Sequence, residues 1–526
     1  MSESRRGILN AAGLLAASVL VARLLGFLRD ALFAHHVGVG PAADAYFAAF
    51  MIPDMLGYLM AAGAAAIAVT PPYVQRLEKL GPEAAARFAS SVVGNVAFFS
   101  IVLTIVLWIF AEPLLRLQFG RFEPEVLEET ARLMRIVLPA QVFFLTGGVL
   151  RGVLMAHGRF GPQAAASVIY SAGPIVGGLV IAGVDGFAWG TLVGAAIGQW
   201  AVPVIALRRL PGAVGRIRVG LFDADFREYV WLAMPLMLGL GLTTVDEWYE
   251  KWIGGRLAEG AIATITYARK IMMAPVGIVG QAVGAALLPT LTALFQRDDR
   301  DAFDDLFSTT LRMTVGLGIL ASGALMVLGL PVVELLYERG RFTAIHSRDV
   351  SEILLILAVA IPGWVLQQVA VRGFYARGEM WRAMALSTVV ALAVFPLYLW
   401  GGSSAGVRGL AIASASAISL NALITIVWLR VRCGTPNLST LVETLARSLA
   451  IAGIAGAVTF YALEWIVASV RGPALDLPWI ELALGGAIYG LAMLVAVSFL
   501  GDAPLRAALD RLRARLLRRS TTTPAE

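Results

Sequence analysis

Cysteine, histidine and charge are scarce in this sequence of 526 residues. The single cysteine, Cys433, excludes an intramolecular disulfide and a metal site built on cysteines, and the four histidines show no metal-ligand spacing. Charged residues make up 15% of the chain, against about 25% in soluble globular proteins. These charges are too few to cover the surface of a water-soluble or disordered chain. Walker A, GxGxxG, HExxH and nucleophile-elbow motifs are absent too, so we expect no enzyme chemistry.

Long apolar runs are what the chain does have, with 58% hydrophobic residues and a mean hydropathy of +0.77. The runs are roughly 20 residues long, which suits membrane-spanning helices and not the roughly ten-residue alternating segments of a β-barrel. We therefore predict an all-α polytopic membrane protein with about 14 transmembrane helices. The predicted spans are 8–28, 44–73, 90–111, 132–156, 162–183, 187–207, 228–253, 262–294, 311–336, 350–376, 381–400, 408–430, 440–468 and 478–500.

Lysine and arginine are distributed unevenly between the predicted loops. The loops near Arg76, Arg208 and Arg430 are basic, whereas the 112–129 loop is net acidic. The positive-inside rule then places both termini in the cytoplasm, and it accounts for the net charge of +6 without a nucleic-acid partner. The basic and apolar residues of the tail 503–526 predict an amphipathic helix at the anionic leaflet.

An internal repeat relates the two halves of the chain. Arg121-Phe122, Pro139 and Arg151-Gly152 match Arg341-Phe342, Pro362 and Arg372-Gly373, at offsets of about 220 residues. Because six spans separate the copies, both have the same topology and are related by an axis along the membrane normal. We predict two pseudo-symmetric six-helix lobes, 1–220 and 221–435, followed by two extra helices (436–502) and the basic tail (503–526).

Charged residues inside the predicted spans are candidates for function, since each costs several kcal/mol unless it faces water or a partner. The cations fall in the first helices of both halves, which predicts a hydrated, positively charged cavity for an anionic ligand. Arginine suits a diphosphate because it forms bidentate hydrogen bonds. The residues concerned are Arg23, Arg29, Asp44, Asp54, Arg151, Asp246, Glu247, Glu250, Lys251, Arg269, Lys270 and Arg372.

A structural alternative stands beside the functional interpretation at several of these positions. For Arg23 the functional interpretation is favoured, because its surroundings are entirely apolar. Arg29 with Asp30 is equally well explained as an interfacial ion pair, and anchoring at a span end is favoured for Arg151 and Arg372. The sequence Asp223-Ala-Asp225 resembles a glycosyltransferase DxD motif, but it has no nucleotide-binding domain beside it, so we interpret it as a cytoplasmic loop.

Five sequence blocks resemble the MurJ (MviN) lipid II flippase family of the MOP exporter superfamily. They are ARLLGFLRDALFAHHVGVGPAADAYFAAFMIPDMLGYLMAAGAAA (22–66), ITYARKIMMAPVGIVGQAVGAALLPTL (265–291), ELLYERGRFT (334–343), VRGFYARGE (371–379) and GLAIASASAISLNALI (409–424). The resemblance implies two six-helix lobes that form a V around a cationic cavity, with helices 13 and 14 shaping a groove for a polyprenyl tail. It implies alternating access that carries the undecaprenyl-diphosphate-linked peptidoglycan precursor, lipid II, to the outer leaflet of the bacterial cytoplasmic membrane. Expected partners are this precursor and membrane lipids, with the monomer as the functional unit.

The resemblance also assigns residues. Arg23 and Arg29 correspond to the family's essential cavity arginines, Lys270 takes the place of its helix 8 arginine, and Asp44 matches its helix 2 aspartate. Asp246 looks like the helix 7 aspartate that ligates sodium in some members, and Ser414 fits a hydroxyl ligand. Sodium is thus the one candidate coupling ion, and no other cofactor is expected.

The chain departs from the family pattern at several positions. A cavity arginine is replaced by Gly57, two glutamates by Ala62 and Met273, and two helix 11 positions that bear Asn and Asp in sodium-binding members hold Ser387 and Ala391. Arg269 and Lys251 are candidates to replace the missing cavity charge. The alternatives are a flippase for another polyprenyl-linked oligosaccharide, a cation-coupled small-molecule exporter of the same superfamily, and a non-transporting membrane scaffold.

Overall fold

The computed structural model describes residues 2–59, 65–210, 212–220, 223–237, 242–469, 477–507 and 509–510. These residues form helices and connecting loops and contain no strand, which confirms the all-α class. Ala62 and the tail from residue 511 lie outside the described residues. The chain divides into two compact units: unit 1 is Met1–Leu240, Gly255–Ala263 and Arg339–Thr343, and unit 2 is Gly241–Gly254, Thr264–Glu338 and Ala344–Glu526.

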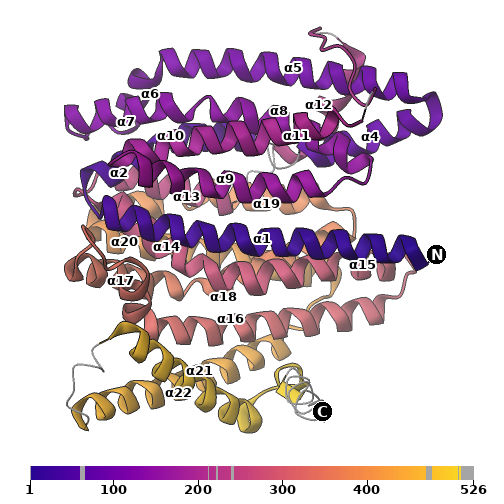
Figure 1. The fold of residues 1–526 in the computed structure, drawn as a ribbon. Coiled ribbons are helices and arrows are strands. Elements are labelled where there is room, and N and C mark those ends of the chain that lie inside the picture. Colours follow the sequence, from indigo (N-terminus) through magenta and orange to yellow (C-terminus); the bar gives the residue numbers. More distant parts are fainter. Residues whose placement is uncertain are drawn as a thin grey trace, which may run out of the picture. The chain divides into compact units, whose positions relative to one another are not determined.

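Unit 1 contains the first twelve α-helices, shown from indigo to magenta in Figure 1. They are α1 (Ser2–His36), α2 (Pro41–Ala49), α3 (Met51–Leu59), α4 (Ala65–Leu80), α5 (Pro82–Ile109), α6 (Ala111–Gln118), α7 (Pro124–Val137), α8 (Ala140–Ala156), α9 (Gly161–Val180), α10 (Val184–Gly194), α11 (Val202–Leu207) and α12 (Ala224–Met237). A π-helical segment, η1 (Ala195–Ala201), joins α10 to α11.

Unit 2 contains the remaining helices, apart from the first residues of α14, which belong to unit 1. They are α13 (Leu242–Gly254), α14 (Ala261–Val276), the π-helical η2 (Gly277–Gln281), α15 (Ala282–Gln296), α16 (Arg300–Tyr337), α17 (Ala344–Ala358), α18 (Ile361–Ala376), α19 (Met380–Ala393), α20 (Phe395–Cys433), α21 (Leu438–Ser469) and α22 (Pro478–Leu500).

Among the described residues, nine helical stretches are long and apolar enough to cross a membrane, or ten if one bent pair counts as a span. This agrees with a polytopic membrane protein, and the count of about 14 stays a prediction. Several predicted spans are interrupted. The span predicted over 44–73 contains α3 and parts of α2 and α4, and the span predicted over 381–400 is divided between α19 and α20. Helix α20 is also broken at Ala405 and Gly406, whose backbone angles are not helical, and this break lies between the predicted spans 381–400 and 408–430.

The two copies of the sequence repeat break at the matched proline. Pro139 separates α7 from α8, and Pro362 is the second residue of α18, which is bent by 44° from α17. Proline has no N–H for the helical ladder and its ring clashes with the preceding turn. The same residue therefore interrupts the helix at the corresponding place in each half.

Glycines allow α9 and α10 of unit 1 to pack backbone to backbone. A Cβ on Gly173 would lie 2.4 Å from the carbonyl oxygen of Gly190, and one on Gly177 would lie 2.0 Å from that of Gly186. Both helices thus carry small residues four positions apart, the pattern that permits close helix contact in membranes. Helix α1 packs against α9 in the same unit.

Helices α21 and α22 of unit 2 pack against α16, and all three contribute to one apolar core that includes Val315, Ile451 and Val497. The Tyr489 hydroxyl of α22 donates to the carbonyl oxygen of Leu320 at 2.8 Å. The two helices beyond the repeat are therefore built into the core of unit 2.

Candidate functional site

Arg29, the cationic residue near the end of α1, is paired and only partly buried. Its Nε and Nη2 lie 3.0 and 2.9 Å from Oδ1 of Asp30. The Arg29 side chain remains 31% exposed, whereas that of Asp30 is 8% exposed. The ion pair predicted as the alternative does form, and it uses only one carboxylate oxygen and two of the guanidinium nitrogens.

A pocket of about 270 Å³ with a mixed polar and apolar lining lies in unit 1 and includes Tyr170. Asp54 of α3 contributes a carboxyl group to its lining, and Gly57 lies one turn further along the same helix. A Cβ on Gly57 would lie 2.9 Å from Oε1 of Gln141, so an amide occupies the space beside this glycine. The pocket is lined by Phe50, Asp54, Gly57, Tyr58, Val137, Ala140, Gln141, Phe144, Tyr170 and Thr191.

Asp44 is committed to backbone contacts. Its Oδ2 accepts from the N–H of Gly260 at 2.7 Å, and its Oδ1 accepts from the N–H of Ala263 at 2.8 Å. The residue is 4% exposed. Free N–H groups at a helix start favour a carboxylate, so Asp44 joins α2 to the beginning of α14 within unit 1.

Arg151 is buried inside unit 1, at 7% exposure. Its Nη1 donates to Oε1 of Gln199 at 2.5 Å and to the Gln199 carbonyl oxygen at 3.3 Å. The guanidinium therefore ties α8 to the π-helical segment η1. The matched residue of the repeat, Arg372, lies over the ring of Tyr375 in unit 2.

Four charged or hydroxyl side chains meet in the interior of unit 2. Arg269 of α14 donates through Nε to Oε2 of Glu250 at 2.6 Å and through Nη2 to Oδ2 of Asp246 at 2.6 Å. Nη2 also contacts the second Glu250 oxygen and lies 3.0 Å from the hydroxyl of Ser414. Asp246, Glu250 and Ser414 are 1–2% exposed, and Arg269 is 7% exposed. We call these four residues the Arg269 cluster.

Two further hydroxyl contacts complete the Arg269 cluster. The Tyr398 hydroxyl donates to Oδ1 of Asp246, and the Ser414 hydroxyl donates to Asp246 Oδ2 at 3.1 Å. Tyr398 and Ser414 both belong to α20, so the cluster links α13, α14 and α20. Every carboxylate oxygen of Asp246 and Glu250 has a donor, which is the condition for keeping ions in an apolar interior.

Lys251 forms a separate pair one turn away. Its Nζ lies 2.8 Å from Oε1 of Glu247, with the lysine side chain 6% exposed and the glutamate 42% exposed. Lys270, which follows Arg269 on α14, is partly exposed, as is Arg23 on α1. The structure thus brings Asp246 and Ser414 together, and it places Arg269 between them and Lys251 beside Glu247.

Sequence reasoning identified the spacing of Asp246 with Glu250 and of Glu247 with Lys251. It named Arg269 only as a candidate for the missing cavity charge, and it missed Arg269 as the shared partner of Asp246 and Glu250 and Tyr398 as a donor. One signal could have indicated that Arg269 is paired. Helices α13 and α14 together contain three acidic residues (Asp246, Glu247, Glu250) and three basic ones (Lys251, Arg269, Lys270). This equality favours mutual pairing, because a membrane interior does not tolerate unpaired charge.

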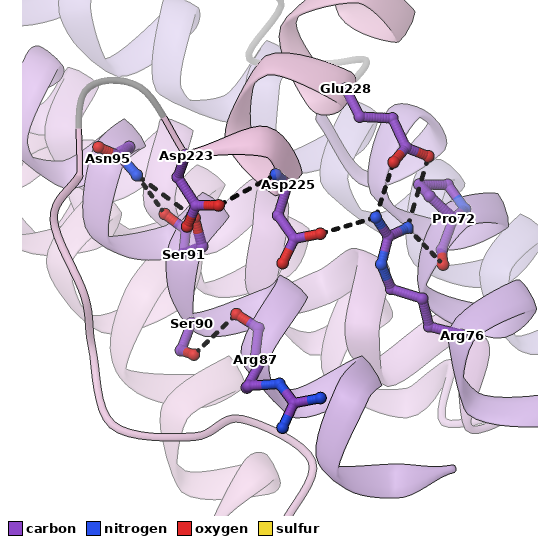
Figure 2. A network of polar contacts seen from close by, with 9 residues as sticks. All are labelled: Pro72, Arg76, Arg87, Ser90, Ser91, Asn95, Asp223, Asp225 and Glu228. Atoms are coloured by element: carbon purple, nitrogen blue, oxygen red, sulfur yellow. Dashed lines mark hydrogen bonds and ion pairs between the residues drawn. The ribbon is translucent and has the colours of Figure 1, made fainter. Parts of the chain in front are cut away.

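The Asp223-Ala-Asp225 sequence is engaged in contacts between the ends of α4, α5 and α12 (Figure 2). Asp223 accepts from the Ser91 hydroxyl at 2.5 Å. Arg76 lies 2.7 Å from both Asp225 and Glu228. These carboxylates therefore hold helices of unit 1 together. The loop predicted over Asp223-Ala-Asp225 ends at Asp223, because Ala224 and Asp225 already belong to α12.

Metal ligands are not grouped in the part of the chain that the structure describes: no three His, Cys, Asp or Glu side chains there are placed to hold an ion. The predicted sodium ligands Asp246 and Ser414 are near each other, but the Arg269 guanidinium contacts both of them. The residues present do not fit a sodium ion in this arrangement.

Comparisons with solved structures define the fold class. A structure of the lipid II flippase MurJ in an inward closed conformation matches with a TM-score of 0.75 and 20% identity, covering 93% of this chain and all of the other. An inward-facing multidrug-resistance MATE transporter of the MOP superfamily matches with a TM-score of 0.67 and 17% identity, covering 80% of this chain and 96% of the other. The chain shares the fold of these two proteins, which places it in the same fold class.

Sequence comparison identifies the family within this class. The family model described as lipid II flippase MurJ matches residues 33–471, and the chain belongs to that family. A probable lipid II flippase MurJ of Rhizobium tropici is 29% identical over 428 residues, covering 77% of this chain and 78% of the relative. That of Bdellovibrio bacteriovorus is 27% identical over 513 residues, covering 94% and 95%.

Proposed function

We propose that this protein moves lipid II from the cytoplasmic to the outer leaflet of the bacterial cytoplasmic membrane by alternating access. The observation that carries the proposal is the match of the lipid II flippase model over residues 33–471. Curated flippase relatives that cover almost the whole chain support it. The process moves a bound lipid and includes no covalent step.

The candidates for contact with the diphosphate are cationic side chains that remain accessible. In unit 1 these are Arg23 and Arg29, since both are partly exposed. In unit 2 it is Lys270, which is partly exposed as well. Arg269 and Lys251 are buried in ion pairs with carboxylates, so we do not assign them to the substrate. Asp44 holds the start of α14 in place through its two backbone contacts.

The membrane potential supplies energy for the return of the empty carrier. Each positive charge that crosses the full potential contributes about 2.3 kcal/mol per 100 mV. Since the cell interior is negative, the cationic residues of the empty protein favour the inward-facing state. The protein works as a monomer with both termini in the cytoplasm.

The test is complementation of a bacterium depleted of its own lipid II flippase. We expect Arg23→Ala to be present in the membrane at the normal level and to fail to restore growth and lipid II export. Arg87→Ala is the matched control, because Arg87 is an exposed arginine of unit 1 at the start of α5, and it should restore both. Full rescue by Arg23→Ala would contradict the role of this residue in substrate binding.

A flippase for another polyprenyl-linked oligosaccharide is the second candidate. It is favoured by the amide of Gln141 beside Gly57, where the family resemblance implies a cavity arginine. Native mass spectrometry of the purified protein separates the two, since the mass of a co-purifying lipid reports its saccharide. Lipid II in the spectrum supports the first proposal, and a different diphosphate-linked glycan supports the second.

A further inference from the structure

The Arg269 cluster has the ligand chemistry of a cation site. Two carboxylates and one hydroxyl surround Nη2 of Arg269: Oδ2 of Asp246 lies at 2.6 Å, Oγ of Ser414 lies at 3.0 Å, and a Glu250 oxygen is also in contact. Carboxylate and hydroxyl oxygens are ligands that hard metal cations prefer. A guanidinium nitrogen stands where these oxygens converge.

We propose that Arg269 is the resident cation of this site, so that the transport cycle neither binds nor releases an alkali-metal ion here. The inference rests on the proposed flippase function for its role in transport. The claim about ion binding stands on the geometry of unit 2 alone.

The space that a metal ion would need is already occupied. A metal ion bound to both Asp246 Oδ2 and Ser414 Oγ would need the volume that Nη2 occupies, because these two oxygens are 3.1 Å apart and both contact this nitrogen. The Arg269 side chain is held by further bonds to Glu250, one of them from Nε at 2.6 Å. Its displacement would leave a buried guanidinium without partners, which is costly.

The charges around the cluster also disfavour an added cation. Helices α13 and α14 carry three carboxylates and three cationic side chains, so their formal charges balance without an added ion. A sodium ion would introduce a surplus positive charge next to Arg269. Repulsion between like charges at this distance is strong in an interior of low dielectric constant.

The neighbouring helix α19 lacks the ligands that a sodium site would need. The two positions where the family resemblance implies an amide and a carboxylate ligand hold Ser387 and Ala391. The Ser387 hydroxyl accepts from Nε2 of Gln367 at 3.5 Å, and the carbonyl oxygen of Ala391 accepts from the Tyr249 hydroxyl at 3.3 Å. The helix therefore adds no carboxylate to the cluster.

A resident cation changes what the site does. In a sodium-coupled carrier, an ion that arrives and leaves can tighten and loosen the helices around it. Here the cation that links α13, α14 and α20 is the side chain of Arg269. Because it is covalently part of the chain, it is present at every stage of the cycle. The cluster therefore holds the three helices of unit 2 together permanently. The energy for transport is not supplied by an ion that binds at this site.

Ion binding by the purified protein tests this inference without a transport assay. Thermal unfolding is compared in sodium, potassium and choline chloride at equal ionic strength, together with equilibrium binding of radioactive sodium. We expect the same melting temperature in all three salts for the natural protein and no saturable sodium binding. We expect Arg269→Gln to open the site, which gives a saturable melting-temperature rise with sodium that is absent with choline.

The double variant Arg269→Gln/Asp246→Asn should lose this sodium response, because it removes a carboxylate ligand of the opened site. Arg76→Gln, in unit 1, is the matched control for loss of an ion-paired arginine and should show no sodium response.

Saturable sodium binding by the natural protein that Asp246→Asn abolishes would overturn the inference, and so would an Arg269→Gln variant that folds yet ignores sodium. If Arg269→Gln does not fold, the natural protein decides the question by itself. In vesicles with reconstituted protein, lipid II flipping should proceed at the same rate in sodium and in choline. A complete lack of flipping would count against the proposed function and would leave the ion-binding result standing.

Discussion

Arg76 links two helices that are about 150 residues apart in the chain. It reaches from α4 to Asp225 and Glu228 of α12 at 2.7 Å (Figure 2). Its guanidinium also lies 4.3 Å from the ring centroid of Phe88. Partial burial opposes the charge of Arg76, but the hydrogen bonds to Glu228 and Asp225 outweigh it, so that the pKa of Arg76 is raised. The Arg76 guanidinium therefore stays charged across the physiological pH range.

We predict that Arg76→Gln destabilises unit 1. Two carboxylates lose their partner, and hydrogen bonds to charged groups contribute roughly 1.5–3 kcal/mol each when buried, a value that partial exposure reduces here. The measurement is the melting temperature of the purified protein in detergent, which should fall by several degrees. Arg87→Gln serves as control, since its side chain is exposed. Equal melting temperatures for the two variants would contradict this role.

The candidate site could be predicted in part at this scale. Asp246 and Ser414 were chosen from the family resemblance, and the structure brings them to within 3.1 Å of each other. The charge count of α13 and α14 indicates that Arg269 is paired, but its particular contacts could not be predicted, because residues 246, 269 and 414 meet only after three helices have packed. Their sequence separation carries no information about which oxygen faces which nitrogen.

Helices α9 and α10 pack closely through their glycines. Their contact depends on the absence of side chains at Gly173, Gly177, Gly186 and Gly190, since backbone atoms of the facing helix approach to 2.0–2.4 Å from the position of an added Cβ. Packing of this kind replaces the hydrophobic driving force, which is lacking between helices in lipid.

Substitution of glycine by alanine at a packed and at an open position should separate the effect of helix packing from that of helix propensity. Gly190→Ala should destabilise the protein by about 1–3 kcal/mol through overpacking, because the new Cβ would lie 2.4 Å from a carbonyl oxygen. Gly486→Ala in α22 meets no atom within 4 Å. There the better helix propensity of alanine should be neutral or stabilising, by up to about 1 kcal/mol. Thermal unfolding in detergent gives both values, and a destabilised Gly486→Ala would refute the explanation.

The predicted elements agree with the structure where one apolar run forms one helix, as in α5, α21 and α22. They differ where a run contains glycine and proline. The run 44–73 reads as one span but is divided among α2, α3 and α4. Hydropathy indicates how long an apolar segment is. It does not show where the helix is broken, because neighbouring helices can form hydrogen bonds with the backbone groups that a break leaves free.

Orientation is a property of the whole molecule, and it stays a prediction from the distribution of lysine and arginine. Cys433→Ser would give a chain without cysteine, into which single cysteines can be placed. Glu125→Cys in the acidic loop should react with a membrane-impermeant maleimide in intact spheroplasts. Lys79→Cys at the end of α4 should react only after lysis. The reverse labelling pattern would place the termini outside.

The amino-acid sequence by itself determined the helical class, the membrane environment, the family and the repeat. These properties depend on local composition and on the order of motifs along the chain, which one sequence displays directly. The lobe boundaries and the substrate-binding residues remain predictions of the same kind.

Only the tertiary structure decided which charges satisfy one another. Asp44 is bound to backbone N–H groups more than 200 positions away, Gln141 fills the space beside Gly57, and Arg269 occupies the oxygen cluster that the sequence assigned to sodium. Helix packing selects these partners by distance and direction, because a buried charge is stable only where donor and acceptor meet within about 3 Å.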